Sequence, residues 1–133
     1  MVTDLERIGD QAADIADLVR HMDGEHIYSI VQHLPPMAEL SVEMVHNSIV
    51  AFVSEDMELA KETIEQDDKV DELFDQVKNE VVEILKSDPD KMDSSINFLM
   101  IAKYLERIGD HAENICDWTE FSETGDYKNA RIL

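Results

Sequence analysis

Two sets of polar side chains at four-residue spacing are the part of this sequence best suited to chemistry. Glu106, Asp110 and Asn114 form one row, and Asp67 and Asp71 form a second pair. Residues four apart lie above one another on a helix, so each set presents oxygen atoms along one line. Stacked like charges destabilise a helix by roughly 0.2–0.5 kcal/mol, and a bound multivalent cation would remove that repulsion. Such oxygen donors suit hard cations and iron.

The hydrophobic pattern predicts the helices that must position these rows. Apolar residues recur at steps of three and four over about 3–20, 36–53, 57–86 and 91–120. In the last segment they form a seam of the kind found in helical bundles; its members are Phe98, Ile101, Leu105, Ile108, Ala112 and Ile115. Helix formers dominate, and there are only four glycines and three prolines. The predicted fold is all-α, an antiparallel up-down helical bundle.

Short polar breaks separate the predicted helices. Thr3 and Glu6 have the spacing of a capping box at the start of the first helix. Asp56 is a candidate N-cap for the third, and Asp88-Pro89 ends that helix and caps the next. Connections this short favour antiparallel neighbours.

Composition limits the classes of function. The 133 residues carry 31 acidic and 11 basic side chains, a net charge of −20. That balance disfavours nucleic-acid binding and docking on an anionic membrane, and it favours cations or basic protein surfaces. Solubility or adaptation to high ionic strength is an equally good explanation of the charge. No apolar run approaches the ~18 residues of a membrane span, so neither membrane insertion nor a secretory leader is expected, and the expected location is cytoplasmic.

An internal repeat carries the strongest information about organisation. Residues 5–12 recur as residues 105–112, beginning with six consecutive identities, Leu-Glu-Arg-Ile-Gly-Asp. We interpret this as two copies of a domain that each end in this helix. Residues 1–23 would be the third helix of an incomplete first repeat, 24–35 a linker, 36–121 a complete three-helix repeat and 122–133 a tail. The chain is expected to be a truncated piece of a longer protein, with a shortened gene product as the alternative. Helices missing from the first repeat would leave apolar surface uncovered and favour a homodimer.

The doubled motif resembles that of the PhoU family, and Ile64–Leu73 is similar to that family's middle-helix motif. The resemblance covers about residues 3–118. It implies two three-helix bundles in tandem and a regulatory role in phosphate transport and phosphate signalling. It implies action through protein–protein contact, with the ATPase of the phosphate ABC transporter and a sensor kinase as partners. No enzymatic activity is expected.

The same resemblance implies metal binding, because the family's E(D)-x-x-x-D motifs hold multinuclear iron or zinc clusters on the bundle surface. Carried over to this sequence, the ligands are Asp67, Asp71, Glu106 and Asp110, supported by Asn114. By the same correspondence Glu6, Asp10 and Asp14 form half of a second site. The open alternative is that all of these acids belong to the solvated face of a very acidic protein.

The repeat also contains two arginines and two glycines. Arg7 and Arg107 are expected to pair with neighbouring acids, with phosphate contact as the alternative. Gly9 and Gly109 lie inside predicted helices, where glycine costs roughly 1 kcal/mol relative to alanine. Close helix packing or room beside a metal cluster would compensate that cost.

A second function is compatible with one further motif. Glu43 and His46 have the Glu-x-x-His spacing of ferritin-like di-iron carboxylate bundles, which oxidise or store metal. Those bundles need the motif on two helices, and this sequence contains it once. A thiol-rich zinc site and an internal disulfide are excluded because Cys116 is the only cysteine.

Overall fold

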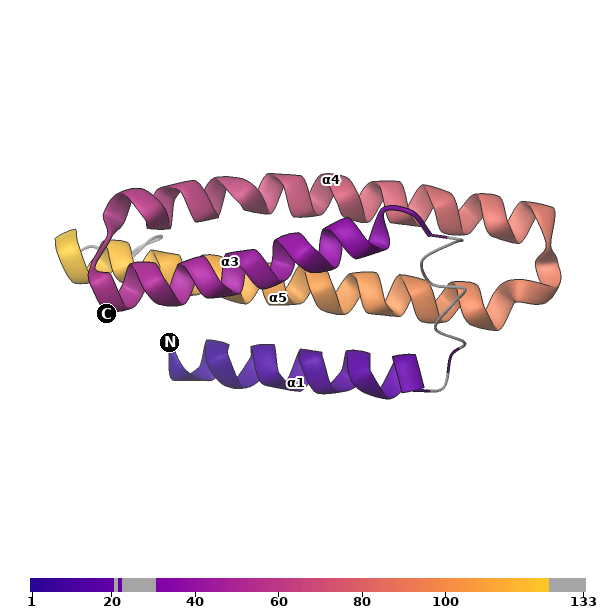
Figure 1. Cartoon of the computed structure of the whole chain (residues 1–133), viewed down its shortest axis with the longest axis horizontal. Helices are drawn as coiled ribbons and strands as arrows, with labels where there is room; N and C mark the ends of the chain where they lie inside the picture. Colours follow the sequence, from indigo (N-terminus) through magenta and orange to yellow (C-terminus); the bar gives the residue numbers. More distant parts are fainter. Residues whose placement is uncertain (21, 23–30, 125–133) are drawn as a thin grey trace.

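The computed structural model describes residues 1–20, 22 and 31–124, and within these residues the chain is helical with no strand. Its elements are α1 (Val2–Arg20), α3 (Leu34–Ser54), α4 (Met57–Ser87), a short 3-10 turn η1 (Pro89–Lys91) and α5 (Met92–Thr124). The helices run side by side with alternating direction (Figure 1). The predicted all-α up-down bundle is therefore confirmed. Residues 24–30 of the expected linker and 125–133 of the expected tail lie outside the described residues.

Most helix ends follow the signals in the sequence. Asp56 caps α4, because its carboxylate accepts a hydrogen bond from the Leu59 amide at 3.0 Å. Between α3 and α4, Glu55 has a left-handed φ of 55°, and the Asp56 amide donates to the Ala51 carbonyl at 2.9 Å. Helix α3 begins at Leu34, before both prolines, since the first turn has amides without helical partners.

The predicted capping box at the first helix is wrong. Helix α1 begins at Val2, so Thr3 lies inside its first turn, and the Leu5 amide donates to the Met1 carbonyl at 3.2 Å. Glu6 is exposed on the helix surface.

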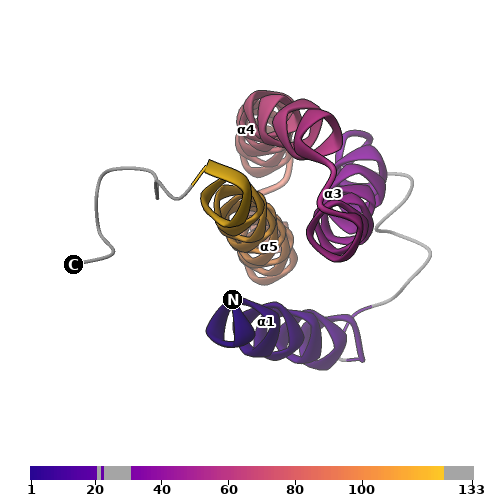
Figure 2. The ribbon, with the colours of Figure 1, turned by 90° about the vertical axis from the view of Figure 1, so that its left-hand side faces the viewer.

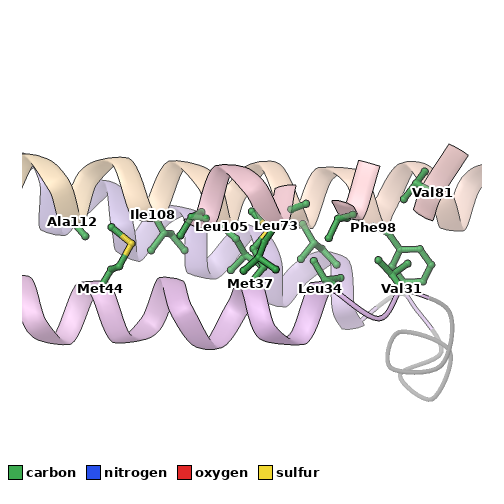
Figure 3. Packing of buried hydrophobic residues seen from close by; sticks show 14 residues of the cluster. Val31, Leu34, Met37, Met44, Leu73, Val81, Phe98, Leu105, Ile108 and Ala112 are labelled. Carbon is green, nitrogen blue, oxygen red and sulfur yellow. The ribbon is translucent and has the colours of Figure 1, made fainter. Parts of the chain in front are cut away.

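Helices α3, α4 and α5 enclose the hydrophobic core. Met37, Met44 and Phe98 are fully or almost fully buried there, at 0%, 0% and 1% exposure (Figure 3). All six residues of the predicted seam in the last helix are buried, and on α4 Val70, Val77 and Val81 face them. The helix pattern read from the sequence is therefore also the pattern of burial.

Helix α1 packs on the outside of the bundle, against α5 (Figure 2). None of its residues is buried, and its half-buried Ile8, Ile15 and Leu18 pack against the core cluster. This position of α1 beside the other three helices agrees with the predicted bundle. A polar contact accompanies the packing: His111 Nδ1 lies 2.9 Å from Asp4 Oδ1, and the Asn114 amide donates to the same oxygen at 3.2 Å.

We expect Asp4→Ala to loosen α1 from the bundle. The change leaves two half-buried polar groups of α5 without their partner, at a cost of about 1 kcal/mol. Hydrogen exchange should therefore accelerate in α1 and stay slow in α4. Asp14→Ala, at an exposed position of the same helix, is the matched control and should leave exchange unchanged. Equal exchange in both variants would show that Asp4 does not anchor α1.

Candidate metal centre

Three carboxylates from α4 and α5 come together on the surface of the bundle. Asp67 of α4 and Asp110 and Glu113 of α5 each offer one oxygen, and these oxygens lie within 4.8 Å of one another. Buried neighbours position them: Val70 on α4 and Ile108 on α5 pack into the core and turn the adjacent flanks toward each other. Two antiparallel helices thus supply a compact set of oxygen donors.

Asp67 is the most strongly perturbed member. Its Oδ1 atom is buried and has no hydrogen-bond partner among the described residues. Burial, contact with the Glu113 carboxyl and the charges of Asp110 and Asp71 together raise the pKa of Asp67 from 3.8 to about 8. An unpaired carboxylate here is unfavourable, so the position favours either a proton or a cation.

The neighbouring acids belong to the same electrostatic cluster. Burial raises the pKa of Asp110 and of Asp71, and the charge of Glu106 raises both further. We refer to Asp67, Asp71, Glu106, Asp110 and Glu113 as the acidic patch. All four acids proposed as ligands from the family resemblance therefore lie in one patch.

Within the patch, those four acids have different contacts. Asp67 and Asp110 share the compact group with Glu113. Glu106 instead pairs with Lys103, whose Nζ lies 2.7 Å from Glu106 Oε1. Asp71 is exposed at the edge of the cluster.

Glu113 was not among the residues predicted from the sequence. It lies three residues after Asp110 and so on the same side of α5, a spacing that was available as a signal. The internal repeat did not indicate Glu113, because the residue at the matching position of the first copy is Ala13. Whether the Glu113 carboxylate reaches Asp67 depends on the rotation of α5 relative to α4.

Other predicted residues lie elsewhere. The Asn114 side-chain amide donates a hydrogen bond to Asp4 of α1. In this conformation Asn114 is therefore not placed as a supporting metal ligand. Arg107 lies over the ring of Tyr104, 6.0 Å from its centroid, and exposed Arg7 is 3.8 Å from Asp10. The acids proposed as half of a second site, Glu6, Asp10 and Asp14, are all exposed on α1.

The two repeated glycines have different surroundings. A Cβ atom on Gly109 would lie 3.4 Å from Asp67 Oδ1, 3.7 Å from Val70 Cγ1 and 3.8 Å from Met44 Sδ. These are ordinary van der Waals distances, so close helix packing does not require glycine here, and the absent Cβ leaves space beside the buried oxygen of Asp67. Around Gly9 no atom of the described residues lies within 4 Å of such a Cβ, so neither explanation applies to it here.

The donor atoms of the acidic patch suit a cation that prefers oxygen ligands. The members of the patch are carboxylates, one of which has the unpartnered buried oxygen next to the space at Gly109. Thiolate ligation is disfavoured, because burial raises the pKa of the Cys116 thiol to about 12. Carboxylate oxygens accept iron readily and also bind zinc.

Comparison with known proteins gives the family. An all-α bundle with an acidic patch between its last two helices defines only a broad class, but residues 34–119 match the model of the PhoU domain. The chain belongs to the PhoU family.

Named relatives agree with that assignment. The chain is 38% identical over 125 residues to a phosphate-specific transport system accessory protein PhoU homolog of Clostridium acetobutylicum, covering 94% of this chain and 57% of the relative. It is 38% identical over 121 residues to PhoU homolog 1 of Methanothermobacter thermautotrophicus, covering 90% and 55%.

A solved structure has the same fold. The phosphate transport system regulatory protein PhoU from Streptococcus pneumoniae aligns with a TM-score of 0.84 and 28% identity, covering 96% of this chain and 60% of that one. This chain thus spans little more than half the length of the relatives it matches. No described helix is long and apolar enough to cross a bilayer.

The alternative of a ferritin-like di-iron bundle is not supported. The matched family and fold are those of PhoU. Glu43 and His46, which carried that alternative, are exposed on α3 and do not project into the core of the bundle.

Proposed function

We propose that this chain is a PhoU-type regulator of phosphate transport and phosphate signalling, acting by contact with other proteins and without a reaction of its own. The observation that carries the proposal is membership of the PhoU family, whose named relatives are accessory proteins of the phosphate-specific transport system. Its partners are the ATPase of the phosphate ABC transporter and a sensor kinase. A net charge of −20 supports recognition of a basic partner surface.

The second part of the proposal is a cation in the acidic patch. Asp67, Asp110 and Glu113 would hold the first cation, with Asp71 and Glu106 available to a cluster of iron or zinc ions. Support comes from the unpartnered oxygen of Asp67 and from the all-oxygen donor set. A bound cation supplies positive charge that neutralises mutual repulsion and ties α4 to α5.

A homodimer remains part of the proposal. Val42, Ile49 and Val53 are all exposed and lie at steps of seven and four residues on α3, so they share one side of the helix, and this apolar stripe supports an association surface. Light scattering at high concentration tests it, and a persistent monomer would contradict it.

Binding to the transporter ATPase of the same organism tests the main proposal. We expect saturable binding to the immobilised ATPase that weakens at least tenfold between 50 and 500 mM salt, because an acidic surface meets a basic one. An ATPase subunit from an unrelated importer is the control. Equal binding to both subunits would contradict a specific role in phosphate transport.

A further inference from the structure

Lys103 is a cation at the edge of the acidic patch. Its Nζ lies 2.7 Å from Glu106 Oε1 and 5.6 Å from the centroid of the Phe74 ring. Phe74 belongs to α4 and Lys103 to α5, so the lysine contacts both of the helices that carry the patch. Its charge also acts on Asp110, where it lowers the pKa against the effect of burial.

This ion pair differs from an ordinary surface pair of the same chain. Lys86 and Glu83 are also three residues apart, but their nearest atoms are 3.7 Å apart and their side chains are 70% and 74% exposed. In the Lys103 pair, Glu106 is only 17% exposed, and the Phe74 ring packs against the ammonium group. Partial burial and the aromatic contact reduce the screening and freedom that weaken most surface pairs.

We propose that Lys103 is an internal counter-ion of the acidic patch, which holds Glu106 in the metal-free protein and competes with an entering cation for that carboxylate. The inference rests on the proposed metal binding and adds a residue that regulates it. The compact group of Asp67, Asp110 and Glu113 omits Glu106, as expected if Lys103 holds Glu106 back. A first cation therefore binds the compact group, and Glu106 joins only when Lys103 leaves it.

Zinc titration of the full chain by calorimetry, in a non-coordinating buffer at low salt, tests this role. Lys103→Gln should tighten zinc binding by roughly fivefold to tenfold, because the carboxylate becomes available and a repelling charge is lost. Lys103→Arg retains the charge and should stay within about twofold of the parent. Lys86→Gln removes the same charge from a distant pair with the same spacing and should also change affinity by less than about twofold.

A double-mutant cycle with Glu106→Gln separates competition from simple charge. If Lys103 acts through Glu106, the gain from Lys103→Gln should fall below about twofold in the Glu106→Gln background. A gain that persists there, or zinc binding by the parent that Lys103→Gln leaves unchanged, overturns the inference and leaves the metal proposal standing. Failure of every folded variant to bind zinc overturns the metal proposal and this inference with it.

Discussion

Zinc at a hundredfold excess over its dissociation constant should raise the free energy of unfolding of this protein by about 2.7 kcal/mol. The stabilisation arises because the folded chain brings the carboxylates of Asp67, Asp110 and Glu113 together, and the unfolded chain separates them. For a chain of this length the corresponding increase in Tm is roughly 10 °C. Thermal unfolding followed by circular dichroism, with and without zinc after chelator treatment, measures the effect.

The increase in stability caused by zinc should depend on the acidic patch and not on the total charge of the protein. The double variant Glu106→Gln with Asp110→Asn should lose most of it, and adding Glu113→Gln should remove the remainder. Without metal, the double variant should be as stable as the parent or slightly more so, because repulsion is relieved. Glu39→Gln with Glu43→Gln is the matched control: both residues are exposed and four apart on α3. A double variant that still responds to zinc like the parent would place the site elsewhere.

Without metal, the stability of the protein should fall as pH rises from about 4 to about 8. In the folded state the pKa of Asp67 is raised from 3.8 to about 8, so across this window the folded chain holds a proton that the unfolded chain has released. Folding is therefore favoured at the acidic end, and the contribution is lost as pH passes through the folded pKa. Partial burial and coupling to Glu113 reduce the expected loss to on the order of 1–3 kcal/mol.

Urea unfolding in the presence of a chelator, at pH values from 5 to 8.5, measures this dependence. Asp67→Asn cannot ionise, so its advantage in stability over the parent should grow with pH and become constant above about pH 8. Asp68→Asn removes the same charge at the exposed neighbouring position and is the matched control, which should stay closer to the parent than Asp67→Asn does. Parallel curves for the parent and Asp67→Asn would show that Asp67 ionises normally in the folded chain.

Local features of the sequence determined the helices and the family. The seam from Phe98 to Ile115 and the cap at Asp56 are properties of residues close together in the chain, and both appear in the structure as predicted. The repeat of residues 5–12 at 105–112 identified the family resemblance that the comparisons confirm. The repeat also indicated Glu106 and Asp110, and the four-residue spacing of Asp67 and Asp71 indicated the second pair, because helical spacing places each pair on a single flank.

The partners of each acid were decided only by the tertiary structure. The spacing of Glu113 from Asp110 did not show that Glu113, and not Glu106, would join Asp67. Nothing in the sequence turned Asn114 toward Asp4 or set Lys103 beside Phe74 of another helix. Those contacts depend on how far α5 rotates and slides when the buried side chains of α3, α4 and α5 interlock. A rotation of α5 by one residue, about 100°, would turn a different flank of this helix toward α4. The packing of the whole core therefore decides which acids meet.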